Sequence, residues 1–559
     1  MKRQLRSNYE KGTSLWAVRR AQWRALGLTD EDMEKPKIAV VNTSSELAIC
    51  FSHLDGVAKI VKEAIREAGG LPFEIRTAAP SDFIHSAGHA GNYILPSRDL
   101  ITNDIEVQVE GAKLDGMICL TSCDKTVPGH LMAAARLNIP TLLVIGGYQP
   151  SGVYRNHHVD IEEVFLGAGH HVAGKLSYDD LLGMSENAIG GPGVCSGMGT
   201  ANSMHIVTEA LGMSLPGAAP VMANSKRMMD FAKRSGRRIV EMVGENLLPR
   251  AIMTPDAFAN AAMAVLAVSG SINCIKHLQA TALEAGLPLD FYKLFDEISD
   301  KVPVLSAVRP IGESSIEAFE AAGGALAVLK QLEPMLRTGA LTVSGKTVAE
   351  NLREVKVEDT ETIRPLARPL SDKASIVIVR GSLAPDGGIA KLGLRRDKIL
   401  TFTGRARCFA TADAAMAALK EKKIVPGDVI VLRGLGVRGG PGMGMASRVV
   451  FALDGAGLGA DVAFVTDGQL SGLVNKGLVV GEVTPEAAVG GPIRLIEDGD
   501  RIAIDAEAKT IMLDVPEAEL AARRAKFVQK DQHSEEGWLA IYERSVQPLS
   551  RGAALVRPK

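Results

Sequence analysis

The sequence predicts an α/β protein with an N-terminal parallel-sheet domain and a C-terminal β-barrel-like domain. Short, continuous apolar runs alternate with amphipathic stretches in the first 150 residues, and residues 225–350 have mostly helical patterns. Beyond about residue 375 the apolar runs are short, β-branched and separated by turn signals. Continuous apolar runs are typical of strands buried on both faces, and strand–helix–strand alternation is typical of parallel sheets.

Three runs are the predicted strands of the first domain: "KIAVVNT" (37–43), "GMICLTSC" (116–123) and "IPTLLVIGG" (139–147). Between the first two lies "HLDGVAKIVKEAIREAGG" (53–70), an amphipathic stretch that ends on Gly-Gly, as helices commonly do. A glycine-rich segment, "GGPGVCSGMGTANSM" (190–204), precedes another helical pattern. These patterns predict helices over the sheet and a glycine-rich loop before a helix.

Residues 356–375 indicate the domain boundary, because the segment is charged, holds two prolines and has no periodicity. We therefore expect an α/β domain over residues 1–365 and a barrel-like domain over residues 375–559. The predicted strands of the second domain lie in "SIVIVRG" (375–381), "KILTFTG" (398–404), "GDVIVLRG" (427–434), "DVAFVTDG" (461–468) and residues 492–515.

Composition narrows the class of protein. A chain of 559 residues exceeds what one hydrophobic core normally supports. With 46% apolar and 23% charged residues and a net charge of −2, we expect a globular protein without a nucleic-acid or membrane partner. The N-terminus has no apolar signal-peptide core, and no run approaches the roughly 20 apolar residues of a membrane span. Six cysteines are too few for a disulfide scaffold, so we expect a reducing, cytoplasmic setting.

The stretch "CLTSCDKTVPG" (119–129) holds two cysteines that could be a redox pair, part of a metal site or buried thiols. On one strand, Cys119 and Cys123 would lie about 13 Å apart at ~3.3 Å per residue. A disulfide needs Cα atoms within ~7 Å, so they are not a redox pair. Cys119 lies inside the apolar run and is interpreted as an inert core thiol. Cys123 lies at the strand's carboxyl end, where ligands bind in open parallel sheets.

Cys50 and Cys195 share the setting of Cys123, since each lies in a loop just before a helical pattern. A thiol before a helix N-terminus has its thiolate stabilised by the helix dipole and free amides. Singly, each has a structural explanation; together they indicate a metal or iron–sulfur site. Cys274 and Cys408 have no comparable setting and are interpreted as structural.

Carboxylates supply a second candidate group. Asp124 and Lys125 adjoin Cys123, and Asp82 lies in a loop rich in Gly, His and Ser. Oxygen ligands suit Mg²⁺, whereas the alternative is that both aspartates cap helices.

The chain resembles the dihydroxy-acid dehydratase/6-phosphogluconate dehydratase family, which includes sugar-acid dehydratases. The matching motifs, in the family's order over nearly the whole chain, are "SDFIHSAGHAGNYILPSRD", "TSCDKTVPG", "GVCSGMGTANSM", "LTVSGKTVAENL", "RGSLAPDGGIAK", "GGPGM", "VTDGQLSG" and "VTPEAAVGGPI". The resemblance implies an α/β domain carrying a cluster and a swivelling β-barrel domain. It also implies a dehydratase of 2,3-dihydroxy carboxylates that forms 2-keto-3-deoxy acids and assembles as a homodimer or homotetramer.

The resemblance also implies site residues. Cys50, Cys123 and Cys195 would be ligands of a [2Fe–2S] or [4Fe–4S] cluster. Mg²⁺ would be bound by Asp82, Asp124 and a carbamylated Lys125. Ser471 of "TDGQLSG" would be the catalytic base, and Asn273, Thr466 and Gly468 would bind the hydroxy-acid substrate.

The sequence departs from the family pattern in two places. Where the family usually has a magnesium-binding Glu after GGPGM, this chain reads "GGPGMGMAS" with Met445, and a second usual Glu upstream is absent. The stretch "SGSINCIKHL" (269–278) also differs, although Asn273 and His277 remain. Branched-chain dihydroxy acids and sugar acids both stay open as substrates, and the altered loop slightly favours a relaxed or sugar-acid specificity.

Two functions of other classes compete with a dehydratase. A non-catalytic iron–sulfur redox sensor would have lost its magnesium site, but Asp82, Asp124, Lys125 and Ser471 are all retained. A phosphate-binding enzyme could use "GGPGVCSGMGT" as a cradle, but no Gly-Lys-Ser/Thr follows. The dehydratase is therefore the leading hypothesis.

Overall fold

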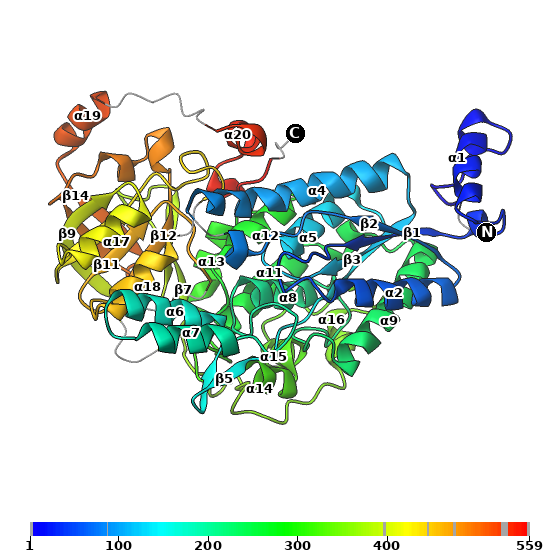
Figure 1. Cartoon of the computed structure of the whole chain (residues 1–559), viewed down its shortest axis with the longest axis horizontal. Coiled ribbons are helices and arrows are strands. Elements are labelled where there is room, and N and C mark those ends of the chain that lie inside the picture. The colour runs from blue at the N-terminus through cyan, green and yellow to red at the C-terminus, as the bar shows by residue number, and fades with distance from the viewer. Residues whose placement is uncertain are drawn as a thin grey trace.

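The structure is a computed structural model that describes residues 4–85, 88–394, 399–443, 446–472, 474, 477–526 and 535–555. Its two halves lie side by side, with the first, mostly helical half beside a β-rich second half (Figure 1). The prediction of a parallel-sheet α/β part followed by a barrel-like part is confirmed. None of the helices described is both long enough and apolar enough to cross a membrane.

The first sheet has four parallel strands in the order β2-β1-β3-β4. These are β1 (Lys37–Asn42), β2 (Leu71–Arg76), β3 (Gly116–Thr121) and β4 (Thr141–Ile145). Every residue of β1, β3 and β4 is buried, which explains their continuous apolar sequences. Because the strands are parallel, the segments that follow β1, β3 and β4 emerge at the same edge of the sheet.

Helices cover this sheet and complete the first half (Figure 1). Helix α8 is buried at every residue, and α2 and α9 pack against each other beside the sheet. The elements are α1 (Ser14–Ala25), η1 (Asp32–Glu34), α2 (Leu54–Glu67), α3 (Asp82–His85), η2 (Gly88–Tyr93), α4 (Ile94–Gly111), α5 (Thr126–Leu137), β5 (Gly152–Tyr154), β6 (His157–Val159), α6 (Ile161–Val172), α7 (Tyr178–Asn187), α8 (Thr200–Ala210), α9 (Lys226–Glu245), α10 (Pro249–Ile252), α11 (Pro255–Ala267), α12 (Asn273–Glu284), α13 (Phe291–Ser299), α14 (Ile316–Ala321), α15 (Gly324–Leu332) and α16 (Val348–Leu352).

The second half is built on an eight-stranded sheet in the order β14-β13-β9-β10-β11-β12-β8-β7. A parallel bridge between Arg380 and Thr510 joins its two edges, so the sheet is a nearly closed barrel around its own apolar core. The elements are β7 (Ile376–Val379), β8 (Gly387–Lys391), β9 (Thr401–Phe409), α17 (Ala412–Lys420), β10 (Asp428–Leu432), α18 (Ser447–Gly455), β11 (Ala463–Thr466), β12 (Leu478–Thr484), η3 (Ala487–Val489), η4 (Pro492–Leu495), β13 (Arg501–Asp505), β14 (Thr510–Asp514), α19 (Glu517–Ala525), α20 (Gly537–Ser545) and η5 (Leu549–Arg551).

The two halves share a continuous apolar core. One cluster of buried side chains extends from Ile38 of β1 to Ile430 of β10. Helix α6 packs on α18, where the rings of Phe165 and Phe451 meet edge to face with centroids 5.0 Å apart. This shared core fixes the loops of the barrel against the first half.

The segment after α20 returns to the first half. The carbonyl of Ala553 accepts hydrogen bonds from Arg98 Nη2 at 2.7 Å and from the Tyr542 hydroxyl at 3.2 Å. The backbone N–H of Leu555 donates to Asp99 Oδ1 at 3.1 Å. Residues 549–555 therefore form a clasp, which lies against α4 and α12; we call it the C-terminal clasp.

One predicted strand is partly wrong. Residues 492–515 do contain β13 and β14, but residues 492–495 form the 3₁₀ helix η4. Proline in its first turn favours a helical start, because its φ is preset and its missing N–H is not needed there.

Candidate active site

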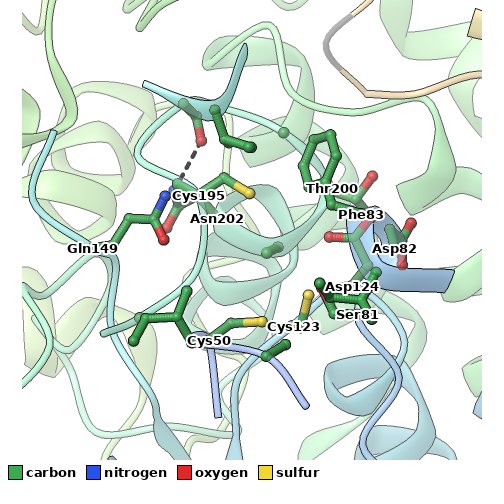
Figure 2. A pocket seen from close by; sticks show the side chains of 18 of the residues that line it. Cys50, Ser81, Asp82, Phe83, Cys123, Asp124, Gln149, Cys195, Thr200 and Asn202 are labelled. Atoms are coloured by element: carbon green, nitrogen blue, oxygen red, sulfur yellow. Dashed lines mark hydrogen bonds between the residues drawn. The ribbon is translucent and has the colours of Figure 1, made fainter. Parts of the chain in front are cut away.

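The segments that follow β1, β3 and β4 meet the start of α8 and the loop after β11 at a cavity of about 150 Å³. Figure 2 shows the sulfur atoms of three cysteines at this cavity, with Asp82 and Asp124 to one side of them and Gln149 to the other. The predicted residues among its lining are Cys50, Asp82, Cys123, Asp124, Cys195 and Ser471. Side chains more than 400 residues apart in sequence thus face one space.

The three thiols come from three different segments. Cys50 lies between β1 and α2, and its carbonyl accepts a hydrogen bond from Ser122 Oγ at 2.6 Å. Cys123 follows β3, and its carbonyl accepts one from Thr126 Oγ1 at 3.0 Å. Cys195 precedes α8, and its carbonyl accepts one from Asn202 Nδ2 at 2.8 Å. Each cysteine backbone is therefore held by a neighbouring polar side chain.

Hydrogen bonding and burial shift the pKa values of the three thiols in different directions. The hydrogen bond from Cys123 lowers the pKa of Cys50, and the same bond, with burial, raises the pKa of Cys123 well above its ordinary value. Burial raises the pKa of Cys195 in the same way. The hydrogen bond with Cys50 and burial at Cys123, and burial at Cys195, thus oppose the stabilisation of the thiolates that is expected from the helix N-termini. They need a positively charged partner to ionise.

The other three cysteines lie away from the cavity lining. Cys119 is fully buried inside β3, as its apolar surroundings predict. Burial raises the pKa of Cys274 to about 12 and that of Cys408 to about 11. These thiols remain protonated at neutral pH.

Two carboxylates and a lysine form the acidic side of the cavity. Lys125 Nζ is fully buried and lies 3.2 Å from Asp82 Oδ2 and 3.6 Å from Asp124 Oδ2. Burial and the charge of Asp82 raise the pKa of Asp124 to about 7. Burial opposes the charge on Lys125, but the two carboxylates outweigh it and raise the pKa of the lysine. One ammonium therefore faces two crowded carboxylates and balances the charge of only one of them.

These donors fit the two inorganic groups expected from the sequence. No set of three or more His, Cys, Asp or Glu side chains in the described ranges is grouped closely enough to hold one metal ion. The thiols instead border a shared space, and three thiols around a space suit a cluster rather than an ion. Asp82 Oδ1 is buried without a hydrogen-bond partner, and carboxylate oxygens suit Mg²⁺.

Ser471 reaches the cavity from the second half. It follows β11, and its backbone N–H donates to Ser447 Oγ at 2.5 Å. The loop that contains it is anchored by Asp467, whose carboxylate accepts from the backbone N–H of Ala487 at 2.9 Å. The serine is thereby brought to the same space as the thiols.

Three residues expected to bind substrate lie behind the cavity rather than on its lining. Asn273, Thr466 and Gly468 are absent from the residues that border it in the described part of the chain. Thr466 Oγ1 accepts from Gly468 N at 2.9 Å, and the amide of Asn273 is fully hydrogen-bonded to the protein. Met445 lies outside the described residues.

The lining residues that were not predicted include three polar side chains after β4 and in α8, which are Gln149, Thr200 and Asn202. Thr200 begins α8 and hydrogen-bonds to Asp124. Gln149 Nε2 and Asn202 Oδ1 are buried without partners. Gln149 follows β4, so its place after a parallel strand is the signal that indicated Cys123 and could have found it.

Comparisons with known proteins agree with this fold. The sequence model named "Dihydroxy-acid/6-phosphogluconate dehydratase N-terminal" matches residues 35–351, and its C-terminal counterpart matches residues 361–553. The dihydroxy-acid dehydratase of Ignicoccus hospitalis is 42% identical over 97% of this chain and 98% of its own. Dihydroxy-acid dehydratase 1 of Methanosarcina acetivorans is 42% identical over 96% and 97%, and the dihydroxy-acid dehydratase of Pyrococcus abyssi is 43% identical over 96% and 97%. The chain therefore belongs to the dihydroxy-acid/6-phosphogluconate dehydratase family and is an enzyme of the dehydratase class.

Proposed function

We propose that the protein removes water from 2,3-dihydroxy carboxylic acids and releases 2-keto-3-deoxy acids. The observation that carries this proposal is the single cavity bordered by three thiols, two carboxylates and a serine. Cys50, Cys123 and Cys195 would hold a [2Fe–2S] or [4Fe–4S] cluster. Asp82, Asp124 and a carbamylated Lys125 would hold Mg²⁺.

When bound, these two groups supply Lewis acidity for the departing 3-hydroxyl and positive charge for the substrate carboxylate and 2-hydroxyl. The protein's own residues do the rest. Ser471, as its alkoxide, takes the C2 proton on its Oγ while the C3–O bond breaks. The departing hydroxide takes up that proton and leaves as water, which returns the serine to its alkoxide, and the resulting enol rearranges to the ketone. The thiols and carboxylates would hold the two inorganic groups, and the substrate would bind in the cavity that these side chains border.

The cavity lining supports a substrate with a short apolar tail. Ile49, Phe83, Ile84, Ile161 and Ile189 border it, and none of its described lining residues is Lys, Arg or His. A sugar acid would place its additional hydroxyls against these apolar side chains, and a phosphorylated one would add charge that none of the described lining residues balances, both of which are costly. We therefore propose branched-chain dihydroxy acids over sugar acids, which is opposite to the slight preference drawn from the altered barrel loop.

A substrate panel tests the proposal. Anaerobically purified protein is given branched 2,3-dihydroxy acids, sugar acids and phosphorylated sugar acids, and 2-keto acid formation is measured. We expect the highest kcat/KM for the branched acids and the loss of most turnover in the Ser471→Ala variant. A higher kcat/KM for sugar acids would reject the substrate assignment, and no keto acid from any member would reject the reaction.

Measurement of cluster content together with turnover distinguishes the dehydratase from a redox sensor. A sensor would hold the cluster without turnover, whereas the dehydratase needs both. Retention of Ser471, Asp82 and Asp124 at one cavity supports the enzyme, because a sensor needs none of them.

We further propose that the protein works in the cytoplasm as a homodimer or homotetramer. Support comes from the sequence alone, since the cysteines are few and the family implies an oligomer. Light scattering of the native protein gives the assembly state.

A further inference from the structure

We propose that a buried ion pair between Lys276 and Glu482 fixes the side chain of Asn273. Through Asn273 the pair positions the loop after β11 that carries Ser471. Lys276 lies on α12 in the first half of the chain, and Glu482 lies on β12 in the barrel. Their side chains are hydrogen-bonded to each other, and both are 0% exposed. The inference rests on the proposed role of Ser471 as the base.

The backbone of β12 is distorted at the residue that supplies the carboxylate. Glu482 has a φ of +55°, and the pairing of β12 with β8 shifts register between Gly481 and Thr484. A positive φ is uncommon for a residue other than glycine, and a bulge re-aims the side chain of the strand. The Glu482 N–H donates to the carbonyl of Gly468 at 3.2 Å, so the bulge also contacts the loop that leads to Ser471.

The ammonium of Lys276 also donates to Asn273 Oδ1, one turn earlier on the same helix. Asn273 Nδ2 in turn donates to Thr200 Oγ1 at 2.9 Å and to the carbonyl of Leu470 at 3.2 Å. An amide has a donor end and an acceptor end of nearly the same shape. A cation at the oxygen therefore selects the orientation in which the NH₂ group faces Thr200 and Leu470.

The two groups that accept hydrogen bonds from the Asn273 amide nitrogen belong to residues at the cavity or next to it. Leu470 directly precedes Ser471, so the bond to its carbonyl restrains the serine backbone. Thr200 lines the cavity and hydrogen-bonds to Asp124. Lys276 and Glu482 are not among the cavity-lining residues, so they act through Asn273 and are positioning residues.

The energetic cost of burying the pair distinguishes a positioning role from a space-filling one. Two charges without solvent are costly unless they are paired. A pair that only filled space would therefore be replaceable by apolar side chains, whereas a pair that orients Asn273 would not be.

The experiment distinguishes a pair that orients Asn273 from a pair that only fills space. The full-length, cluster-loaded protein is compared with Lys276→Met, Glu482→Gln and the double variant Lys276→Met/Glu482→Leu. For each, kcat, KM, iron content and Tm are measured, together with hydrogen exchange of a peptide covering residues 466–472. Lys391→Met is the matched control. Lys391 is also a buried lysine joining the two halves, through bonds to the carbonyls of Ser269 and Gly270 at 2.8 and 2.7 Å, but it has no bond to Asn273.

We expect kcat of Lys276→Met to fall about 100-fold, the loss that a small misplacement of a reacting group can cause, with KM and iron content unchanged. Its Tm falls because Glu482 is left unpaired. The double variant regains Tm but not kcat, since no ammonium orients Asn273. Glu482→Gln keeps an oxygen for Lys276 and retains most of kcat. Lys391→Met loses Tm with kcat retained.

Wild-type kcat in the double variant would overturn the proposal and leave the pair with a structural role only. If Lys276→Met does not fold, the double variant carries the test. Hydrogen exchange separates this proposal from the proposed function, because it needs no substrate. Faster exchange of residues 466–472 in the double variant, but not in Lys391→Met, supports positioning even if no dihydroxy acid is converted. Exchange equal to wild type overturns it.

Discussion

The ammonium of the fully buried Lys125 lies 3.2 Å from a carboxylate oxygen of Asp82, a residue that borders the cavity. The same ammonium lies 3.6 Å from Asp124, so one positive charge serves two negative ones. Carbamylation of the lysine would replace that positive charge by a negative one. Three anions would then face each other, and a divalent cation would be needed to hold them together.

Removal of magnesium should therefore inactivate the enzyme reversibly. We expect chelation to abolish turnover without loss of iron or visible absorption, because the cluster thiols and the carboxylates are separate sets. Added Mg²⁺ should restore turnover, and Asp82→Asn should need more of it. At Met445, which is outside the described residues, Met445→Glu should need less. Full activity after exhaustive chelation would remove magnesium from the mechanism.

Replacement of the cavity cysteines should remove iron. Cys50→Ser, Cys123→Ser and Cys195→Ser are each expected to lose the cluster, because each removes one of three thiols that border the cavity. Cys119→Ser, Cys274→Ser and Cys408→Ser are the controls, since their thiols lie elsewhere and should retain iron. Iron content and the visible spectrum measure the outcome. Full iron in Cys195→Ser would contradict the three-ligand arrangement.

Ser471→Ala should leave the cluster and fold intact while removing most turnover. The loss of a general base typically costs about 10²–10⁴ in rate, and we expect it in kcat more than in KM. Steady-state kinetics and iron content of the purified variant give the comparison. A variant with normal kcat would place the base on another residue.

Glu162 and Gly197 offer a test of the loop that carries Cys195. A Cβ at Gly197 would lie 1.7 Å from Glu162 Oε1, and the Glu162 carboxyl is buried without a hydrogen-bond partner. Gly197→Ala should therefore displace the loop and lower iron content. The double variant Gly197→Ala/Glu162→Ala should recover iron, because the obstructing carboxyl is removed. Normal iron in Gly197→Ala alone would show that the loop adapts without cost.

Glu209 should make stability depend on pH. Burial raises its pKa to about 7, although its carboxylate accepts hydrogen bonds from Gly217 N and Ala219 N, both at 2.7 Å. The folded state holds the proton up to about pH 7, whereas the unfolded chain releases it near its ordinary pKa of 4.5. Stability from this group is therefore greatest in acid and falls by about 3 kcal/mol between these two pH values.

The Glu209→Gln variant lacks this titration, so its Tm relative to wild type should rise from about pH 5 to about pH 8. Thermal unfolding of both proteins across that range measures the difference. A constant difference in Tm would contradict the raised pKa.

The sequence predicted the elements that are locally determined. The strands near residues 37–43, 116–123 and 139–147 are uniformly apolar, because parallel pairing buries both faces. Strand β8, "GGIAK", is not indicated by its pattern, because glycine weakens a strand and its formation depends on pairing with β7 and β12. Burial of the η4 segment resembles that of a strand, but its proline directs it otherwise.

The sequence predicted several residues of the candidate site, but it did not predict which of them lie close together in the folded protein. Cys123 could be assigned from its place after a strand. Its proximity to Cys195 depends on packing within the first half, and its proximity to Ser471 depends on contacts between the two halves. Asn273 is a residue whose role could not be predicted from its position in the sequence. Its position in a motif indicated substrate binding, but its side chain is fully hydrogen-bonded to Lys276, Thr200 and Leu470, which no local spacing reveals.

Because of the C-terminal clasp, the part of the protein that is made first is not the part that is completed first. The ribosome makes α4 and α12 hundreds of residues before it makes Ala553 and Leu555, which bond to Arg98 and Asp99. The backbone of Gly552 rests on α12 next to Lys276 and Ala280. A nascent chain therefore carries an uncovered flank on α12 from the time that α12 is made until residues 549–555 have been added. The contacts of Arg98 and Asp99 with Ala553 and Leu555 form only once residues 549–555 have been made, so the part of the enzyme that is made first depends on a segment that is made after the barrel.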